Sequence, residues 1–227
     1  MKQIYSFLKS LARHNDREWF NAHKDQYLQV KKVADDFAEN LLAALAAIEP
    51  QAALLTVKDV TYRIYRDTRF SSDKSPYKTH IGIFINPPKG KKSLRYGYYF
   101  HLEPGASLIC AGNMPGPSRL TKMIRQDIYD NIDEWLSIVE SPEFKTYFPT
   151  VGSDPLKMAP KGFDKNWKYI DYLKPRDFGA YMEVSDDFYT APDLIDRLVP
   201  VMVQMKRLND FINYTVDIYE ETESSDR

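Results

Sequence analysis

The stretch from residue 63 to residue 78, RIYRDTRFSSDKSPYK, contains residue types that bind anions. It carries five cations and only two acids. Guanidinium groups match the paired oxygens of phosphate and carboxylate, a lysine adds a compact charge, and a tyrosine can donate a hydrogen bond. The stretch therefore predicts a site for a small phosphate- or carboxylate-bearing ligand. The residues predicted to form it here are Arg63, Arg66, Asp67, Arg69, Asp73, Lys74, Tyr77 and Lys78.

A structural ion-pair network is the alternative interpretation of the same stretch. Asp67 can lie against Arg69, and Asp73 against Lys74 or Lys78, so that the segment neutralises part of its own charge. Such a network fixes a loop and binds nothing. Two acids against five bases leave a surplus of about three positive charges, which favours a ligand site in which the acids orient the cations.

A second basic group follows the segment PGPS. Arg119 and, by helical spacing, Arg125 lie near the start of a predicted helix. Helix N-termini attract anions through unpaired N–H groups and the helix dipole. If this helix start meets the 63–78 segment, both would contact one ligand. A solvent-exposed helix face is the alternative.

Proton-transfer chemistry is suggested by His101 and Glu103, which lie two residues apart in a predicted strand and therefore on one face. Cys110 was weighed as a nucleophile, but nothing in the sequence lowers the pKa of this thiol, and a lone cysteine in a strand is usually buried. No metal site is predicted, because the four histidines never occur at i, i+4 spacing and no cysteine pair exists. No cofactor motif is present in the sequence.

The hydrophobic periodicity predicts the elements that position these residues. Residues 1–50 have helical spacing, with a second helix capped by Asn15 and running to about Ile48. Residues 55–115 alternate with a period of two, which predicts four strands near 60–65, 81–85, 98–103 and 109–111. Pro104-Gly105 fits a hairpin turn between the last two strands.

Residues 117–220 return to mostly helical spacing, with FGAYMEV as a further strand and a long helix from Pro192 to about Glu220. We therefore expect an α+β fold, with N-terminal and C-terminal helices packed on a mostly antiparallel sheet of about four to five strands. A single domain is predicted over residues 1–220, with a frayed tail at 221–227.

Composition limits the class of protein. The longest apolar run, LLAALAAI, is too short to cross a membrane, and the single cysteine fits a reducing compartment, so we expect a cytoplasmic protein without membrane association. Net charge is −1, although residues 58–95 hold ten Lys and Arg against three Asp. Nucleic-acid association is one alternative function. A non-catalytic interaction protein, including a homodimer through the acidic C-terminal helix, is another.

The central run also resembles the signature of a known family. Arg63-x-x-Arg66-Asp67-x-Arg69-Phe70, followed by Asp73-Lys74-x-x-Tyr77-Lys78, is similar to the signature of a widespread bacterial family of conserved hypothetical proteins with a domain of unknown function. REWF, GYYFHLEPG and the Leu120-x-x-x-Ile124-Arg125 helix match too, so the resemblance spans nearly the whole chain. AGN at 111–113 departs from a glycine-richer pattern. The resemblance implies a single cytoplasmic domain and no particular chemistry.

Overall fold

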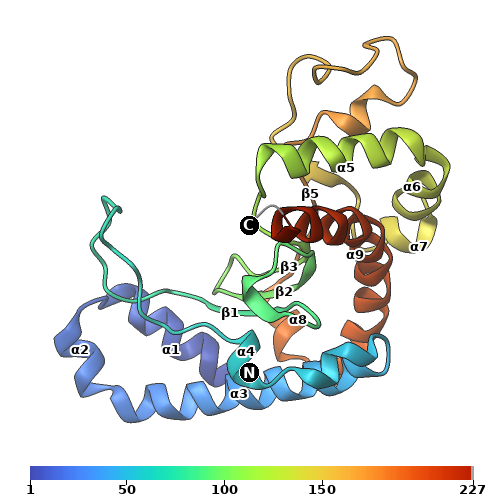
Figure 1. Ribbon diagram of the computed structural model, residues 1–227. Coiled ribbons are helices and arrows are strands. Elements are labelled where there is room, and N and C mark those ends of the chain that lie inside the picture. Colours follow the sequence, from blue (N-terminus) through green and yellow to red (C-terminus); the bar gives the residue numbers. More distant parts are fainter. Residues whose placement is uncertain (226–227) are drawn as a thin grey trace. The chain divides into compact units, whose positions relative to one another are not determined.

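The structure is a computed structural model that describes residues 1–225 (Figure 1). The chain forms two compact units. The first unit consists of residues 1–91, 99–109 and 183–200, and the second of residues 92–98, 110–182 and 201–227. The prediction of one domain over residues 1–220 stays a prediction.

A five-stranded antiparallel sheet confirms the predicted α+β class. Its strand order is β1-β2-β3-β5-β4. The strand predicted from FGAYMEV is confirmed as β5. The short strand β4 lies within residues 117–220, where no other strand is predicted. There β4 pairs Val151 with Ala180 and Ser153 with Asp177. The strands are β1 (Ile81–Ile85), β2 (Gly97–Leu102), β3 (Leu108–Gly112), β4 (Val151–Ser153) and β5 (Asp177–Glu183).

The strand predicted near residues 60–65 is wrong. A short helix, α4 (Val57–Val60), ends at the first of these residues. At its start the Thr56 backbone N–H and hydroxyl both donate to the Asp59 carboxylate, at 2.8 and 2.6 Å. Only isolated bridges follow, Thr61 to Ile83 and Tyr65 to Tyr77. The apolar alternation at 60, 62 and 64 reflects two buried side chains on either side of an exposed tyrosine, and not one face of a sheet.

Three helices open the first unit: α1 (Lys2–Arg13), α2 (Arg17–Ala22) and α3 (Lys24–Ala46) (Figure 1). The single helix predicted from Asn15 is wrong, because the chain breaks at His23, whose ring stacks on Trp19 at 4.1 Å. The cap is Asp16, whose carboxylate accepts from the Trp19 backbone N–H at 2.8 Å. Asn15 is therefore free for a long-range role.

The core of the first unit follows the predicted apolar positions. Ile4, Leu8 and Leu11 of α1 are fully buried. Phe37 of α3 packs edge-on against Tyr189 of α8 (Asp186–Thr190), with ring centres 6.1 Å apart. A 3-10 turn, η1 (Pro50–Leu54), ends the helical part, in agreement with the predicted stop at Pro50.

The second unit is mainly helical, as predicted for residues 117–220. Trp135 lies fully buried between Phe178 and Phe211. The last helix continues to Ser225, beyond the predicted end at residue 220, and residues 226–227 of the predicted tail lie outside the described residues. Within residues 1–225, no helix is long and apolar enough to cross a membrane. The helices are α5 (Ser118–Asp130), α6 (Ile132–Val139), α7 (Pro142–Lys145) and α9 (Leu194–Ser225), and the 3-10 turns are η2 (Gly90–Lys92) and η3 (Ile170–Leu173). The first residues of α9 belong to the first unit, and η2 contains residues of both units.

Candidate functional site

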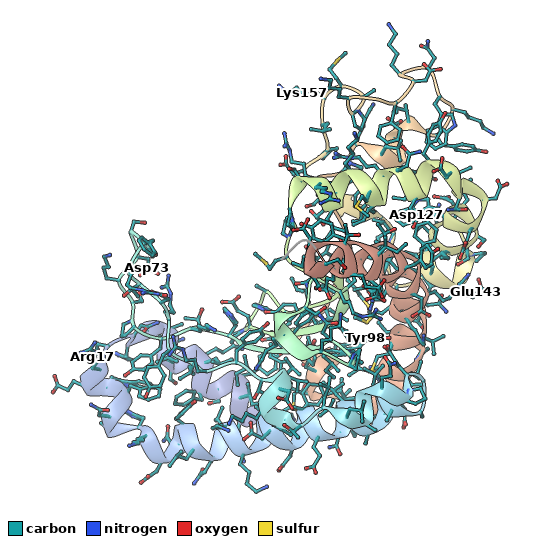
Figure 2. The ribbon with its side chains drawn as sticks, in the orientation of Figure 1. Arg17, Asp73, Tyr98, Asp127, Glu143 and Lys157 are labelled. Atoms are coloured by element: carbon teal, nitrogen blue, oxygen red, sulfur yellow. The ribbon has the colours of Figure 1, made fainter. Side chains whose placement is uncertain are left out.

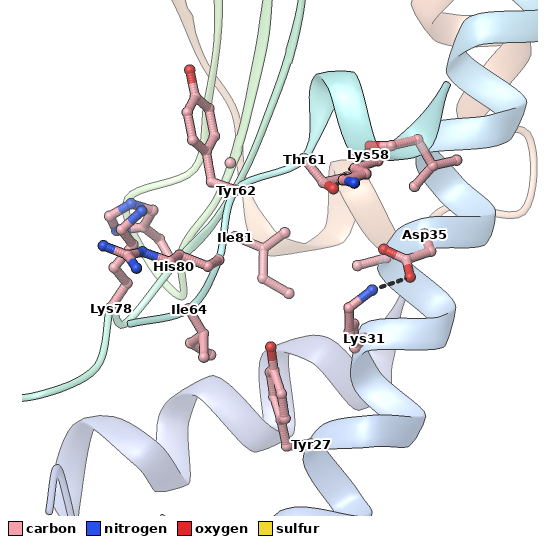
Figure 3. Close-up of a pocket in the computed structure, with 14 residues that line it drawn as sticks. Tyr27, Lys31, Asp35, Lys58, Thr61, Tyr62, Ile64, Lys78, His80 and Ile81 are labelled. Carbon is pink, nitrogen blue, oxygen red and sulfur yellow. Dashed lines mark hydrogen bonds and ion pairs between the residues drawn. The ribbon is translucent and has the colours of Figure 1, made fainter. Parts of the chain in front are cut away.

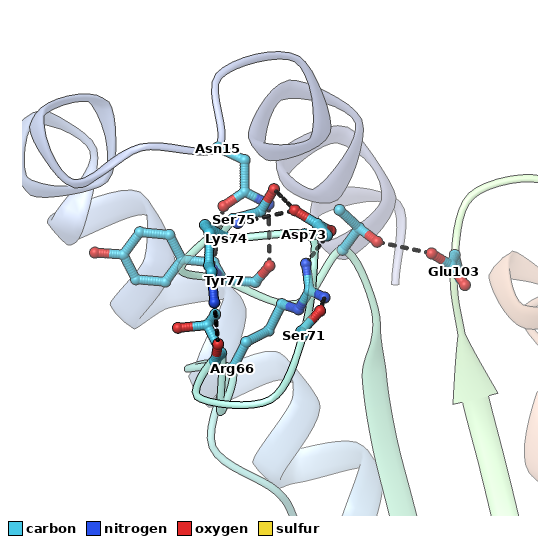
Figure 4. A network of polar contacts seen from close by, with 10 residues as sticks. Asn15, Arg66, Ser71, Asp73, Lys74, Ser75, Tyr77 and Glu103 are labelled. Atoms are coloured by element: carbon cyan, nitrogen blue, oxygen red, sulfur yellow. Dashed lines mark hydrogen bonds and ion pairs between the residues drawn. The ribbon is translucent and has the colours of Figure 1, made fainter.

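The loop from residue 66 to residue 75 neutralises most of its own charge (Figure 4). Arg66 is ion-paired with Asp73 and also approaches the Ser71 hydroxyl. Arg69 makes two bonds to Asp67, from Nε at 2.9 Å and from Nη2 at 2.6 Å. The predicted pair between Asp67 and Arg69 is confirmed, but Asp73 pairs with Arg66 and not with Lys74 or Lys78. We call residues 66–75 the self-paired loop.

Both acids of the self-paired loop also fix its backbone. The Asp67 carboxylate accepts from the Arg69 N–H at 3.2 Å, and the Asp73 carboxylate accepts from the Ser75 N–H at 2.9 Å. Hydrogen bonds from Ser75 and Arg66 hold the pKa of Asp73 well below its ordinary value, and Arg69 lowers the pKa of Asp67 in the same way. The Lys74 ammonium donates to the Thr68 carbonyl at 3.0 Å. These contacts are those of the structural-network alternative.

The base of the loop is held by Asn15, a residue that the sequence analysis assigned to a helix cap. Its side chain donates to the Tyr77 carbonyl at 3.0 Å and accepts from the Tyr77 N–H at 3.1 Å. The Tyr77 ring is buried and stacks on Phe20 at 3.9 Å. Backbone bonds from Arg66 to Pro76 and from Lys78 to Ile64 close the base. Tyr77 is therefore an anchor, with its ring packed in the core.

A cavity lies beside this base. It is about 600 Å³ in volume and is lined by Arg66, Lys74 and Tyr77 of the predicted site, with Arg17 of α2. Figure 2 labels Arg17 on its helix and Asp73 on the loop. Because Arg66 and Lys74 already have acceptors, an anion here would compete with a carboxylate and a carbonyl for them.

The remaining two cations of the stretch face a different cavity, of about 560 Å³ (Figure 3). Arg63 and Lys78 both line it, together with Tyr27, Tyr62 and His80. Among residues 1–225, no carboxylate forms an ion pair with Arg63 or Lys78, whereas the Lys31 ammonium, which lines the same cavity from α3, is paired with Asp35. We call this the cationic cavity.

Lys78 carries its charge in a partly buried position. Desolvation, reinforced by the nearby charge of Arg63, lowers its pKa from the ordinary value. Its ammonium lies 5.3 Å from the centre of the Tyr62 ring, and that of Lys91 lies 5.0 Å from the same ring. Tyr62 is 46% exposed and is thus accessible to a ligand. The electrostatics of the cavity favour a negative occupant.

The other predicted basic residues belong to the second unit and have partners there. Arg119 donates to Glu223 at 2.7 Å and lies 5.8 Å from the Tyr219 ring centre. Arg125 donates to the carbonyls of Leu173 and Pro175, at 2.7 and 2.8 Å. Both side chains thus hold elements of their own unit together. Their convergence with the 63–78 segment stays a prediction.

His101 and Glu103 lie together, as their spacing predicts, in a chain of hydrogen bonds. The Tyr99 hydroxyl is 2.8 Å from His101 Nδ1, and His101 Nε2 is 2.9 Å from Glu103 Oε2. Thr79 donates to Glu103 Oε1 at 2.8 Å. Burial alone would raise the pKa of Glu103, but these bonds from His101 and Thr79 lower it below its ordinary value. Glu103 is therefore ionised near neutral pH.

His80, which immediately precedes the neighbouring strand β1, lies beside this chain of hydrogen bonds. Its ring centre is 4.4 Å from that of His101. Burial, reinforced by His101, lowers the pKa of His80 to about 4, so this imidazole is neutral at pH 7. His80 is not among the predicted site residues. Its alternation with Ile81 and Ile83 is the signal that could have placed it on the polar face with His101.

Cys110 does not have the properties of a nucleophile. It is 7% exposed, and burial, reinforced by Asp177, raises the pKa of its thiol to about 12. A thiol in this environment stays protonated at neutral pH. The nucleophile hypothesis for Cys110 is therefore wrong.

Comparison with known proteins supports the predicted resemblance at the level of the family. A family model described as conserved hypothetical protein (DUF2461) matches residues 3–211. Comparison with curated proteins and with solved structures gives no match. The residue signature in the 63–78 segment and a bacterial origin stay predictions.

Proposed function

We propose that this chain, which belongs to the DUF2461 family of conserved hypothetical proteins, binds a small anionic ligand in the cationic cavity. Arg63 and Lys78 would contact a phosphate or carboxylate group of the ligand. The observation that carries the proposal is that both line one cavity and that neither is paired with a carboxylate among residues 1–225. Every other arginine of the 63–78 segment has an acidic partner within the loop.

Lys78 supplies the energetic reason for anion binding. Partial burial of a cation without a counter-ion costs free energy, since water is removed from the charge and no opposite charge replaces it. A bound anion would supply that charge, and a charge-assisted hydrogen bond contributes roughly 1.5–3 kcal/mol. The ligand-free protein thus carries a cost at Lys78 that an anion relieves.

The walls of the cavity suggest the rest of the ligand. Val57, Ile64 and Ile81 supply apolar surface, and the partly exposed Tyr62 ring offers a face for stacking. A volume of about 560 Å³ falls in the range of small-molecule sites. We therefore expect a ligand with an apolar or planar body and an anionic end, such as a nucleotide, a sugar phosphate or an aromatic acid.

This proposal changes the role of the self-paired loop. Arg66, Arg69 and Lys74 would not contact the ligand, and Asp67, Asp73 and Tyr77 would hold the loop and its base in place. Residues on both sides of the loop line the cavity, Arg63 and Ile64 before it and Lys78 after it. The loop would then act by fixing the position of Lys78.

A thermal-shift panel of nucleotides, sugar phosphates, organic acids and oligonucleotides tests the proposal. A ligand at 100 times its dissociation constant adds about 2.7 kcal/mol, which raises the unfolding midpoint by several degrees. We expect Arg63→Gln and Lys78→Met to abolish the shift and the matched variant Arg69→Gln to retain it.

Three results would contradict the proposal. Loss of the shift in Arg69→Gln alone would return the site to the self-paired loop. A shift from oligonucleotides only, which falls steeply with salt, would favour the nucleic-acid alternative. No shift with any compound would support the non-catalytic interaction protein.

A further inference from the structure

The three side chains His80, His101 and Glu103 form a cluster whose chemistry the proposed anion site does not use. One ligand atom from each lies within 4.8 Å of the others. His101 and Glu103 share a face at the end of β2, and His80 immediately precedes β1, the neighbouring strand. Two imidazoles and one carboxylate are a ligand set that suits divalent transition metals, including zinc and iron.

The hydrogen bonds around the cluster resemble those that orient the ligands of metal sites. Ligating histidines usually hydrogen-bond through the second ring nitrogen, and ligating carboxylates are themselves held by a donor. Here the Tyr99 hydroxyl is bonded to His101 Nδ1, and Thr79 donates to Glu103 Oε1. The atoms that remain, His101 Nε2 and Glu103 Oε2, lie 2.9 Å apart. They are hydrogen-bonded to each other, and a bound metal ion would replace the proton between them.

The distances are compatible with a metal after a small movement. Metal–ligand bonds of about 2.0–2.2 Å allow two ligand atoms on one zinc ion to lie no more than about 4.3 Å apart. His101 Nε2 and Glu103 Oε2 already meet this limit, and the ligand atoms of all three residues lie within 4.8 Å of one another, so at most a small rotation of side chains is needed. His80 lines the cationic cavity, which leaves room for such a rotation.

Burial and access also fit a metal site. The His101 and Glu103 side chains are 14% and 29% exposed, so most solvent is excluded from the ligand atoms. The cavity beside His80 provides a path of entry and leaves room for further metal ligands, such as water or an anion. We propose that His80, His101 and Glu103 bind one divalent transition-metal ion. The proposal is independent of the anion site.

Neighbouring charges set the expected strength of binding. Arg66 and Lys78 both act electrostatically on His80, and their positive charges oppose a metal dication. Removal of one of these charges should therefore tighten metal binding. Lys78→Met is expected to raise the affinity for metal, whereas it abolishes anion binding under the proposed function. The two proposals can thus fail separately.

Titration of the untagged full-length chain with Zn²⁺ in a calorimeter, and with Co²⁺ followed by its visible absorption, tests the site. We expect one ion per chain and a Co²⁺ spectrum of nitrogen and oxygen ligation. Glu103→Gln and His80→Gln should each weaken binding by about 100-fold or more, and Thr79→Val by about 10-fold. His14→Gln, which alters an exposed histidine outside the cluster, is the control.

Each outcome of these titrations either supports or overturns the metal site. One equivalent of metal that is lost in Glu103→Gln and His80→Gln but retained in His14→Gln supports the site. Binding that is equal in all variants, or no binding to the wild-type chain, would overturn it. If Glu103→Gln fails to fold, Thr79→Val with Lys78→Met still decides, because a metal site requires opposite changes in affinity from these two substitutions.

Discussion

The self-paired loop and the cationic cavity use the same residue types in opposite ways. In the loop, Arg66 and Arg69 each have a carboxylate within seven residues along the chain. In the cavity, Arg63 and Lys78 have no ion-pair partner among the residues that the structure describes. Charge that is neutralised locally fixes a loop, whereas charge without an ion-pair partner beside a cavity, as at the exposed Arg63 and the partly buried Lys78, favours an anionic ligand. A high count of cations thus does not locate a site, but their pairing does.

Among the substitutions that test this comparison, Asn15→Ala should cause the largest change in the free energy of unfolding. The substitution removes two hydrogen bonds to the backbone of Tyr77 and leaves part-buried polar groups without partners. We expect a loss of about 2 kcal/mol in the free energy of unfolding, measured by urea denaturation. Asn21→Ala, at an exposed position of α2, should change little. Equal stability of the two variants would show that the loop base does not depend on Asn15.

Lys78→Met should change the free energy of unfolding by less, and it should stabilise the protein whereas Asn15→Ala destabilises it. The substitution removes a partly buried cation that lies near Arg63 and has no counter-ion. After allowance for solvent screening, we expect a gain on the order of a few tenths of a kcal/mol in the ligand-free protein. Lys74→Met, at an exposed lysine of the loop, should give no such gain. Destabilisation by Lys78→Met would mean that this charge already has a favourable environment without ligand.

The smallest effect is expected for Arg69→Gln, because exposed ion pairs contribute little to stability. Its local consequence can still be measured. In the wild-type chain the lowered pKa of Asp67 keeps the ion pair intact above the ordinary carboxyl value of 3.8, and the pair is lost only as pH falls through the lowered pKa.

Carbon NMR of the carboxyl groups should therefore give titration midpoints below 3.8 for both Asp67 and Asp73 in the wild-type chain. In Arg69→Gln, only the midpoint of Asp67 should return toward 3.8. An unchanged midpoint for Asp67 would contradict the pairing, and a matching change at Asp73 would mean that the loop behaves as one network.

Short-range features were predicted well. The alternation over residues 81–85 and 98–103 gave two strands of the sheet, and the helical spacing of Leu120, Ile124 and Ile128 gave α5 with these three residues buried. The strand predicted near residues 60–65 is wrong. A capping box at Thr56 and Asp59 places Val60 at the end of α4, and the residues after it form only isolated bridges, Thr61 to Ile83 and Tyr65 to Tyr77.

The contents of the candidate sites were harder to predict. Asn15 was assigned to a cap because its neighbours suit a helix start, but the adjacent Asp16 takes that role and Asn15 bonds to a residue 62 positions away. For His80, nothing in the spacing of the histidines indicates that its ring lies against that of His101.

The sequence by itself determined the types of element, the family and the excess of positive charge, because these depend on composition and on neighbours within a few residues. Only the tertiary structure decided which cations are neutralised and which line a cavity. Ion pairing depends on distances of a few ångströms in space, and packing sets those distances between segments far apart in the chain. Tyr27, Arg63 and Lys78 line one cavity for that reason.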